Sequence, residues 1–390
     1  MDIVCLSSAY WDEPLWTNKQ HVMSRLAHSN RVLYLDPPLS WIGLLRNRKS
    51  VRGPWGRSFP ALRTKMEGLS VLSFPVLPLE RFDPVSRMNL SICRFFLNRA
   101  VRKLHMTRPV IWVYNPLFWK IADNLPRSLL CYDCVDDFSA FPIYKKIKQR
   151  VIREEERLCR AADLVFTTSQ RLYTGKKTLN PATYLVSNVA DFNHFHQAGR
   201  PGVIPEDLKK IPAPRLVFAG AVSSYKLDFA LLRYLAEKRP SWQIILIGPV
   251  GDGEYVTDLA GVEGLPNVHL LGFRPYTEIP DFLRGADVLL LPYRISEYTE
   301  SMMPLKFHEF MATGKPLVST PLPALAGYRS LLAVGENHGE FLAAVEKALS
   351  GERDEMKTRR IETARENDWE KRISTLLRHV REAVEKKRQK

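Results

Sequence analysis

The chain has 390 residues, of which 45% are hydrophobic and 25% are charged. These proportions are typical of globular domains and exclude a disordered or fibrous chain, and the length favours two domains over one. The formal net charge of +15 predicts an anionic partner, for which nucleic acid, a membrane surface and a phosphorylated substrate are candidates.

The five cysteines are sparse and odd in number, which favours a reducing compartment over a disulfide framework. Cys131 and Cys134 form a C-x-x-C pair, but no second pair or nearby histidine completes a zinc site, so we expect no metal site. The N-terminal sequence has no basic leader, and no run approaches the roughly 18 apolar residues of a transmembrane helix. We therefore expect a cytoplasmic protein.

Short apolar runs alternate with amphipathic stretches in the first half of the chain. The expected strands cover residues 2–8, 31–36, 110–116, 128–133, 163–169 and 183–188, and the expected helices cover residues 19–27, 82–106 and 144–162. This alternation is typical of β-α units on a largely parallel sheet. A Gly- and Pro-rich connection follows at residues 199–214 and predicts a linker.

The same alternation starts again after the linker. It predicts strands in RLVFAG, QIILIG, VHLLG, ADVLLLPY and PLVST, a helix from about Lys226, and a last helix from Trp369 to about Lys386. We expect an α/β protein with two doubly wound, Rossmann-like domains at residues 1–198 and 215–368, and a C-terminal helix at 369–390 that can pack back on the first domain. Ligands bind beyond the carboxyl ends of such strands, so the two domains should face each other across a cleft.

The segment MPLKFHEFMATGKP, residues 303–316, places a lysine in the first turn of a short helix. Pro304 is a natural first helical residue and Gly314 a natural stop. An exposed cation there opposes the helix dipole by about 0.3–1 kcal/mol. A diphosphate would make Lys306 favourable, because the free N–H groups of the first turn also bind anions. Glu309 lies on the same face, and the alternative is a marginal surface ion pair.

Several strings occur in the order that one enzyme family uses. They are LYLDPPLS, WVYNP, YDCVDDFSAF and VSNVADFNHF in the first half, and FAGAVSSYKLD, LIGPVGDG, NVHLLGFRPYTEIPDFLRGADVLLLPY, PLKFHEFMATGKPLVST and NDWEKRI in the second. Over most of its length the chain resembles the GT-B glycosyltransferases, in particular the family-4-like bacterial enzymes of cell-surface polysaccharide synthesis. The resemblance implies transfer of a sugar from a nucleotide donor, a UDP-hexose or UDP-hexuronate, to a lipid-linked or saccharide acceptor, without a cofactor.

The chain departs from the family pattern at three places. After the first strand, SSAYWDEPLW replaces a glycine-rich loop. The usual pair of glutamates eight positions apart has its second member at Glu309, but the first position is Ser301, with Glu300 displaced by one. The arginine that often follows the FAG glycine is Ala221. PLKFHEF is also similar to a segment of the xanthan glucuronosyltransferase family, which inverts. The donor sugar and the stereochemistry therefore stay open.

The resemblance also implies roles for residues of the second domain. It implies that Glu309 accepts hydrogen bonds from the ribose hydroxyls and that Lys226, after the Gly220 turn, binds the diphosphate. Gly220 allows close approach of the backbone. Similar enzymes seat the base against backbone groups at the positions of Gly272 and Phe273. The alternatives are an exposed lysine and an ordinary strand-end glycine followed by an aromatic residue.

The string YDCVDDFSAF places Asp133, Asp136 and Asp137 at the carboxyl end of a strand. An inverting transfer needs a base for the acceptor hydroxyl, and a retaining transfer needs a polar face that stabilises an oxocarbenium-like state. Adjacent carboxylates can raise one another's pKa. We predict Asp136 as the base and Asp137 as the second choice; the alternative is turn and cap chemistry. His194 and His196 are assigned no role.

A basic segment without acids runs from Pro37 to Met66. Its cations are Arg46, Arg48, Lys49, Arg52, Arg57, Arg63 and Lys65, and its apolar residues include Trp41, Ile42, Leu44, Leu45, Trp55 and Phe59. An anionic bilayer attracts such a segment by about 1 kcal/mol per well-placed charge. We expect residues 41–65 to bind the inner face of the cytoplasmic membrane, with helix 82–106 extending that surface; the alternative is a solvated loop.

Three other functions remain open on sequence. A UDP-sugar epimerase on the same fold would need no membrane segment. A basic nucleic-acid-binding protein is suggested by charge alone, but no recognition motif is present and the cations lie beside apolar residues, so we expect no nucleic acid. A single-domain transferase could hold Mn²⁺ or Mg²⁺ on the Asp cluster, but the second set of β-α units argues against it.

Overall fold

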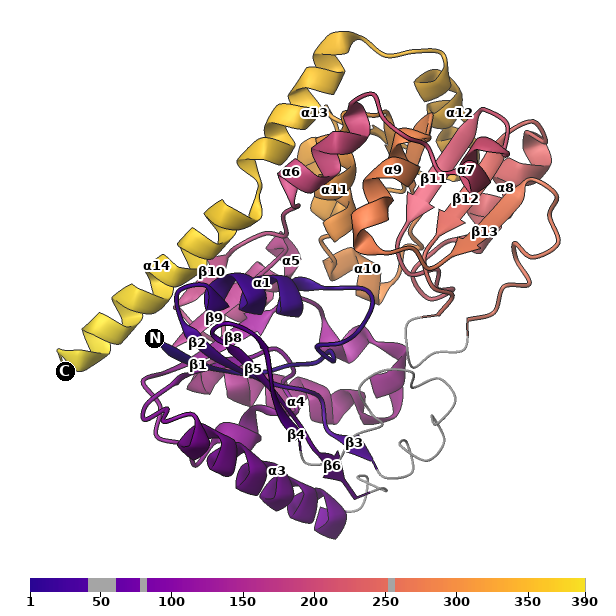
Figure 1. Ribbon diagram of the computed structural model, residues 1–390. Helices are drawn as coiled ribbons and strands as arrows, with labels where there is room; N and C mark the ends of the chain where they lie inside the picture. The colour runs from indigo at the N-terminus through magenta and orange to yellow at the C-terminus, as the bar shows by residue number, and fades with distance from the viewer. Residues whose placement is uncertain (41–60, 78–82, 252–256, 390) are drawn as a thin grey trace. The chain divides into compact units, whose positions relative to one another are not determined.

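The chain forms two compact α/β units (Figure 1), and the computed structural model describes residues 1–40, 61–77, 83–251 and 257–389. Unit 1 comprises Met1–Val186 and Ile373–Lys390, and unit 2 comprises Ser187–Arg372. The long helix α14 (Trp369–Arg388) begins in unit 2, and its residues from Ile373 onward belong to unit 1. Each unit has its own sheet.

Within the described residues, the main sheet of unit 1 has eight strands in the order β10-β9-β8-β7-β1-β2-β5-β4. Among these described strands, β4 alone pairs with its neighbour in antiparallel fashion. The strands are β1 (Asp2–Leu6), β2 (Arg31–Leu35), β4 (Ala61–Met66), β5 (Leu69–Ser73), β7 (Val110–Val113), β8 (Leu129–Cys134), β9 (Leu164–Thr167) and β10 (Thr183–Leu185). A separate small sheet pairs β3 (Leu39–Ser40) with β6 (Pro75–Val76).

Helices connect these strands and cover the sheet of unit 1. They are α1 (Asn18–Ala27), α3 (Asp83–Lys103), α4 (Lys148–Ala161) and α5 (Gln170–Lys177), with the 3-10 helices η2 (Trp119–Ala122), η3 (Phe138–Ala140) and η4 (Pro142–Ile147). Strands β7 and β8 are buried at every position, as expected for strands that are covered on both faces. The core packs these strands against Cys93, Leu97 and Ala100 of α3.

Unit 2 contains a parallel sheet which, in the described part of the chain, has six strands in the order β13-β12-β11-β14-β15-β16. Its strands are β11 (Arg215–Ala219), β12 (Gln243–Ile247), β13 (Val268–Gly272), β14 (Val288–Leu291), β15 (Leu317–Ser319) and β16 (Ala333–Val334). Its α-helices are α6 (Phe192–His196), α7 (Glu206–Lys209), α8 (Phe229–Lys238), α9 (Ile279–Arg284), α10 (Glu297–Ser301), α11 (Leu305–Thr313), α12 (His338–Leu349) and α13 (Asp354–Glu366). Its 3-10 helices are η5 (Gln197–Gly199), η6 (Tyr276–Glu278) and η7 (Pro323–Tyr328).

Each sheet has one point where the direction of strand addition reverses. In unit 1 it lies between β1 and β7, and in unit 2 between β11 and β14. The loops after the two strands at such a point diverge to opposite faces and leave a crevice at the carboxyl edge, where ligands bind in open α/β sheets. The topology therefore directs attention to the loops after β1 and β7 and to those after β11 and β14.

Three glycines stand in a row at the carboxyl ends of β11, β12 and β13. Gly220 N–H donates to Ile247 at 2.8 Å, and Gly248 N–H donates to Gly272, also at 2.8 Å. Gly248 has φ 141°, and a Cβ atom there would lie 2.0 Å from the Gly220 carbonyl oxygen. The backbones of adjacent strand ends therefore approach more closely than a side chain at Gly248 would allow.

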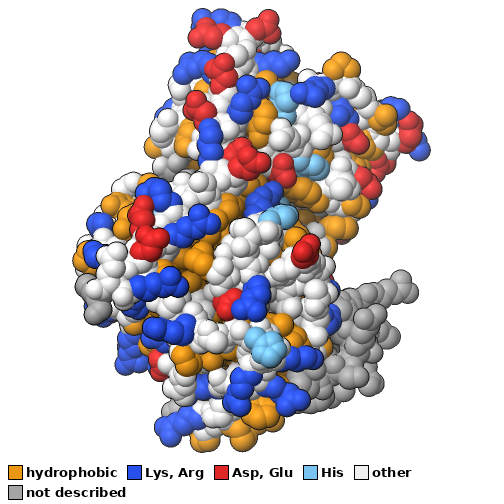
Figure 2. Space-filling view, turned by 60° about the vertical axis from the view of Figure 1, so that its left-hand side comes forward, with side chains coloured by type: hydrophobic (Ala, Val, Ile, Leu, Met, Phe, Trp, Pro, Cys, Tyr) orange, Lys and Arg blue, Asp and Glu red, His pale blue; other side chains and the backbone are white. Residues whose placement is uncertain are grey.

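The basic composition is visible on the molecular surface. On the face shown in Figure 2, Lys and Arg side chains are spread widely, with hydrophobic side chains between them. Among the described residues, no helix combines the length and the hydropathy that crossing a bilayer requires.

The strands predicted from sequence are confirmed, and the helices differ in detail. The predicted helix 144–162 is interrupted, because η4 is a 3-10 helix and the α-helix α4 starts at Lys148. Helix α8 starts at Phe229 and not at Lys226, because Asp228 caps it by accepting from Leu231 N–H at 2.9 Å. Residues 206–209 of the predicted linker form the single turn α7.

We predict that Gly248→Ala lowers the free energy of unfolding by about 3 kcal/mol or more, because it adds both a clash and a strained φ. Gly264→Ala is the matched control, since Gly264 has φ 78° with nothing within 4 Å of an added Cβ. That control should lose only the strain, about 1–2 kcal/mol. Urea titration measures both values, and equal losses would contradict the close approach at Gly248.

Candidate active site

The first turn of helix α11 lies open to an anion. Its N-cap is Pro304, which supplies no side-chain cap, and the helix ends at Gly314 with φ 74°. Gly314 is the stop that the sequence predicts, whereas Pro304 precedes the first helical residue instead of occupying it. Phe307 N–H donates to the Pro304 carbonyl at 3.2 Å. No side chain among the described residues is hydrogen-bonded to the N–H groups of Leu305 and Lys306, so these donors suit an anion.

Lys306 and Glu309 form an ion pair within α11. Lys306 Nζ donates to Glu309 Oε2 at 2.7 Å, and the two side chains are 25% and 7% exposed. Glu309 is therefore buried, which argues against a solvated surface pair. Its carboxylate stays satisfied here by the lysine that lies nearest to it along the helix.

Gly220 lies next to Lys306, although 86 positions separate them in the sequence. A Cβ atom on Gly220 would lie 3.4 Å from Lys306 Cε and 2.9 Å from the Phe218 ring. The loop after β11 and the first turn of α11 therefore meet at the strand-order reversal of unit 2. Because Gly220 has no Cβ, the Phe218 ring and the Lys306 side chain can lie close to its backbone.

Lys226 lies on the neighbouring loop, not at a helix start. Its Nζ lies 5.1 Å from the centre of the Tyr225 ring and 5.9 Å from that of the Tyr298 ring. Arg294 N–H donates to the Lys226 carbonyl at 2.8 Å, which joins the loops after β11 and β14. Lys226 thus lies where the loops after β11 and β14 are joined, with its Nζ over two aromatic rings.

Gly272 and Phe273 lie at the end of β13. Gly272 has φ 71°, and nothing lies within 4 Å of an added Cβ. Phe273 is 41% exposed. Strand β12 lies between β13 and β11 in the sheet. Gly272, Phe273 and Gly220 therefore lie along the same carboxyl edge, and Lys306 lies next to Gly220.

Two buried residues that the sequence analysis did not single out hold the segment before α11. Asn188 Nδ2 donates to the Met303 carbonyl at 2.5 Å, and Arg372 Nη1 donates to Asn188 Oδ1 at 3.0 Å. Burial, with a smaller contribution from Arg372, lowers the pKa of His308 to about 3, so this α11 histidine is neutral. Asn188 lies in the VSN string, but Arg372 is 184 positions away and gives no local signal.

The position where the family has its first glutamate is closed. Ser301 ends α10, is 1% exposed, and its hydroxyl donates to the Tyr298 carbonyl at 3.0 Å. The adjacent Glu300 is half-buried. Ser301 is therefore committed to the backbone of its own helix.

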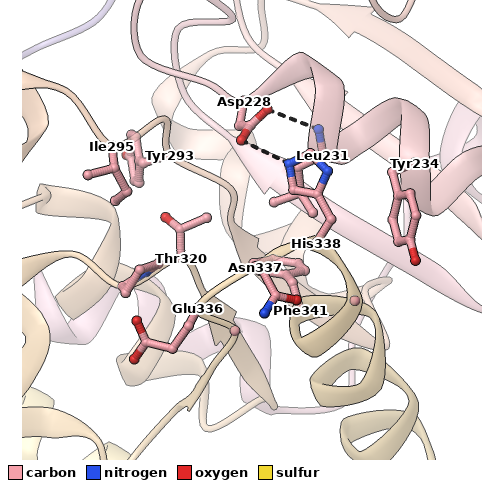
Figure 3. Close-up of a pocket in the computed structure, with 13 residues that line it drawn as sticks. Asp228, Leu231, Tyr234, Tyr293, Ile295, Thr320, Glu336, Asn337, His338 and Phe341 are labelled. Atoms are coloured by element: carbon pink, nitrogen blue, oxygen red, sulfur yellow. Dashed lines mark hydrogen bonds and ion pairs between the residues drawn. The ribbon is translucent and has the colours of Figure 1, made fainter.

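A pocket of about 510 Å³ opens beside the ends of β14, β15 and β16, where Asp228 lies 3.4 Å from His338 Nε2 (Figure 3). Its lining includes Tyr293, Thr320, Glu336 and Asn337. Burial and the charge of Glu309 raise the pKa of Tyr293. None of the site residues predicted from sequence is among the residues lining the pocket.

The three aspartates of the YDCVDDFSAF string have different environments. Asp133 is fully buried and accepts from Trp112 Nε1 at 3.1 Å. Asp137 caps η3 by accepting from the backbone N–H and the hydroxyl of Ser139, at 3.0 and 2.8 Å. Asp136 Oδ2 lies 3.9 Å from Lys19 Nζ, with side chains 18% and 9% exposed. Cap chemistry, the alternative for this string, therefore describes Asp137, and Asp136 is the carboxylate that faces a cation.

The loop after β1 is held from several sides. Trp11 N–H donates to the Asp36 carboxylate at 2.8 Å, and burial raises the pKa of Asp36 to about 6. The Trp16 ring packs on Trp11 and His21, with centroid distances of 5.3 and 5.4 Å, and is 39% exposed. An ordered, half-exposed aromatic ring therefore lies on the loop at the strand-order reversal of unit 1.

Two further sets of residues have contacts within the fold. His194 and His196, which were assigned no role, bond the carbonyls of Tyr276 and Ala312 at 2.9 and 3.1 Å. Residues 41–60 of the basic segment lie outside the described residues. Arg63 and Lys65 lie in β4 and both pair with Asp12, at 3.4 and 2.6 Å.

Comparison with known proteins relates this geometry to a class of enzyme. Residues 213–351 match the family model described as Glycosyl transferases group 1. The chain is 29% identical over 288 residues to the Bacillus subtilis (strain 168) protein named as teichuronic acid biosynthesis glycosyltransferase TuaH, an alignment that covers 67% of this chain and 69% of the relative.

Solved structures share the fold over almost the whole chain. Sucrose-phosphate synthase from Thermosynechococcus elongatus has a TM-score of 0.72 at 13% identity, with 98% of each chain covered. The α,α-trehalose 6-phosphate synthase from Burkholderia multivorans has a TM-score of 0.70 at 12% identity, also with 98% of each covered. Anabaena Alr3699/HepE, solved with UDP and glucose, has a TM-score of 0.62 at 16% identity, with 98% of this chain and 99% of that one covered.

At these identities the solved structures show the fold, which is GT-B, and the family match shows the activity. A glycosyltransferase uses a nucleotide-sugar donor and an acceptor. The chain is therefore a glycosyltransferase with the GT-B fold, and its residues 213–351 match the family model of group 1 glycosyl transferases.

Proposed function

We propose that this enzyme transfers a hexose or hexuronate from a UDP-linked donor to a saccharide or lipid-linked acceptor in the synthesis of a cell-surface polysaccharide. The observation that carries the proposal is the Lys306–Glu309 pair beside Gly220. The name of the Bacillus subtilis relative supports the polysaccharide, and a structure of the same fold solved with UDP and glucose supports the donor.

The diphosphate occupies the first turn of α11 in this proposal. The N–H groups of the first turn and Lys306 together favour a doubly charged group, and the backbone of Gly220 lies beside Lys306. Lys306 turns from Glu309 to a phosphate oxygen, and the carboxylate of Glu309 then accepts from the ribose hydroxyls. The exchange replaces one charge-assisted bond by others, so neither charged group is left unpaired.

In this proposal the uracil ring of UDP lies toward β13. The second cation, Lys226, lies on the loop after β11. The half-exposed Phe273 and the open backbone at Gly272 suit the face and the edge of a pyrimidine ring. Lys226 can leave its two aromatic rings for the outer phosphate. Two lysines and a helix N-terminus then neutralise the diphosphate, so no metal ion or other cofactor is needed.

Asp136 is the proposed base for an inverting transfer. It lies after β8 near the strand-order reversal of unit 1, and Lys19 orients its carboxylate from 3.9 Å. Asp137, the second choice, uses Oδ1 to accept the hydrogen bond from Ser139 N–H that caps η3. The exposed face of Trp16 suits the apolar face of an acceptor sugar ring, which places the acceptor on the same side of unit 1.

The proposed location is the cytoplasmic face of the membrane, with no nucleic acid partner. Residues 41–60, which carry most of the basic segment, are not among those described, and Asp12 pairs with Arg63 and Lys65. Attraction to a bilayer through segment 41–65 therefore depends on the five cations before β4. Other cations of unit 1 that could add to the attraction to a bilayer lie on α3.

The proposal predicts that the purified protein releases UDP from a UDP-sugar in the presence of EDTA. A panel of nucleotide sugars, with a detergent-solubilised bacterial lipid extract as acceptor source, is read by mass spectrometry for free UDP. Turnover should persist in EDTA, because the lysines and the helix N-terminus replace a cation. Turnover that stops in EDTA and returns with Mn²⁺ would contradict the metal-free site, and interconversion of UDP-sugars without release would indicate the epimerase.

Lys306→Ala should weaken UDP binding about tenfold or more, because a charge-assisted bond to phosphate contributes about 1.5–3 kcal/mol. Isothermal titration calorimetry with UDP measures the change. Lys347→Ala is the matched control, since it removes the same charge from the last turn of α12 in the same unit. UDP affinity that is unchanged in Lys306→Ala would remove this lysine from the site.

Asp136→Asn should leave UDP affinity nearly intact and reduce turnover about a hundredfold, the usual scale for loss of a general base. Asp137→Asn, by contrast, should cost about 1 kcal/mol of stability through the weakened cap and retain most turnover. Steady-state kinetics and thermal melts of the two variants separate these effects. The opposite pattern would assign the base to Asp137.

A further inference from the structure

The outward face of helix α3 combines large apolar groups with cations. Met88 is 52% exposed and Phe95 is 63% exposed. They are seven positions apart, and Arg99 and Arg102 continue the same stripe at helical spacing. The opposite stripe, which includes Cys93 and Leu97, is buried in the core. The helix is thus anchored on one side and presents apolar side chains to solvent on the other.

Most of the cations of α3 are exposed. Helix α3 carries five basic residues and one acid. Arg94 bonds the Lys120 carbonyl at 2.9 and 3.1 Å and lies 3.8 Å from Asp123. The other four are exposed, and within the part of the chain that the structure describes none of them lies in an ion pair: Arg87, Arg99, Arg102 and Lys103.

The 3-10 helix η4 continues the surface. Ile143 is 46% exposed, and Lys145 and Lys146 are exposed beside it. Arg150, in the first turn of the following helix α4, donates to Ser86 Oγ near the start of α3 at 3.4 Å. This bond places the beginnings of α3 and α4 next to each other, so the two basic and apolar elements adjoin.

We propose that α3 and η4 form a docking surface for an anionic phospholipid bilayer. The role of this surface in catalysis rests on the proposed function, whereas the docking itself is argued from the exposed residues of α3 and η4 alone. An amphipathic helix that lies on a bilayer inserts apolar side chains at the boundary of headgroups and acyl chains and keeps cations at the phosphates. Phe95, Met88 and Ile143 are the inserted groups, and the exposed lysines and arginines contact the headgroups. A nucleic acid would use the cations and leave Met88 and Ile143 in water.

The surface adjoins the loop that carries the proposed base. Tyr144 of η4 accepts a hydrogen bond from Asn115 Nδ2 at 3.1 Å, and its ring lies 6.3 Å from that of Phe138. Phe138 follows Asp136 by two positions. An acceptor sugar carried on a lipid in the same bilayer would therefore enter beside Asp136, without leaving the membrane surface.

The test is co-sedimentation of the full chain with sucrose-loaded vesicles of 30% phosphatidylglycerol and 70% phosphatidylcholine, without donor or acceptor. Wild type should bind at 0.1 M NaCl and release at 1 M, because the Debye length falls from about 10 to about 3 Å. Phe95→Ser with Met88→Ser should weaken the partition at least tenfold. Reversal of Arg87, Arg99, Arg102 and Lys103 to Glu should abolish it.

The matched control reverses four exposed cations of unit 2, namely Lys238, Lys347, Arg353 and Lys357, and so changes the net charge equally. It should lose less than half of the vesicle binding. Far-UV circular dichroism and thermal melts of every variant check folding. Lys306→Ala should bind vesicles as wild type does, so a failed donor site and a failed docking surface give different results.

Three results would overturn the proposal. The first is that wild type fails to sediment with the anionic vesicles at low salt. The second is that the α3 variants sediment as wild type does. In the second case, loss of binding on reversal of Arg46, Arg48, Lys49 and Arg52 would assign docking to the basic segment alone. The third is an α3 charge reversal that loses a fluorescent 20-base-pair DNA and keeps the vesicles, which would identify a nucleic acid surface.

Discussion

Positive potential accumulates at the first turn of α11, because its N–H groups have no side-chain cap and Lys306 lies among them. In the ligand-free chain Glu309 offsets it from one turn further along the helix. Such an arrangement persists only if the turn is fixed from outside, and the bonds from Arg372 to Asn188 and from Asn188 to Met303 fix it. Gly220, which has no Cβ, lets the loop after β11 lie against the lysine.

Unit 1 uses its carboxylates differently from unit 2. Asp133, Asp36 and Asp137 are occupied with Trp112, with the loop after β1 and with the η3 cap, so they stabilise the strand ends. Asp136 is the member of the group that faces a lysine at the edge of the sheet. A carboxylate held by a lysine at the end of a rigid strand is the arrangement that the proposed base needs.

Local signals were sufficient for most of the fold and for part of the site. Apolar runs located the strands other than β3, β4, β5, β6 and β16, and Gly314 marked the end of α11, because these features act within a few residues. The sequence grouped Gly220 with Lys306 only because their motifs occur in the order typical of the family. No local spacing predicts this contact, since the fold brings together positions that are far apart in the chain. Arg372, and the pairing of Asp12 with Arg63 and Lys65, left no pattern, because each depends on contacts between distant segments. The apolar face of α3 also needed the structure, since periodicity cannot show which side of a helix stays uncovered.

The central claim is that a nucleoside diphosphate binds at the first turn of α11, and a crystal structure of the protein with UDP tests it most directly. The account predicts the diphosphate within hydrogen-bond distance of Lys306 Nζ and of the first-turn N–H groups, with both ribose hydroxyls on the Glu309 carboxylate and the Lys306–Glu309 bond lengthened. UDP in the pocket lined by Asp228 and His338, with the Lys306–Glu309 pair unchanged, would contradict it.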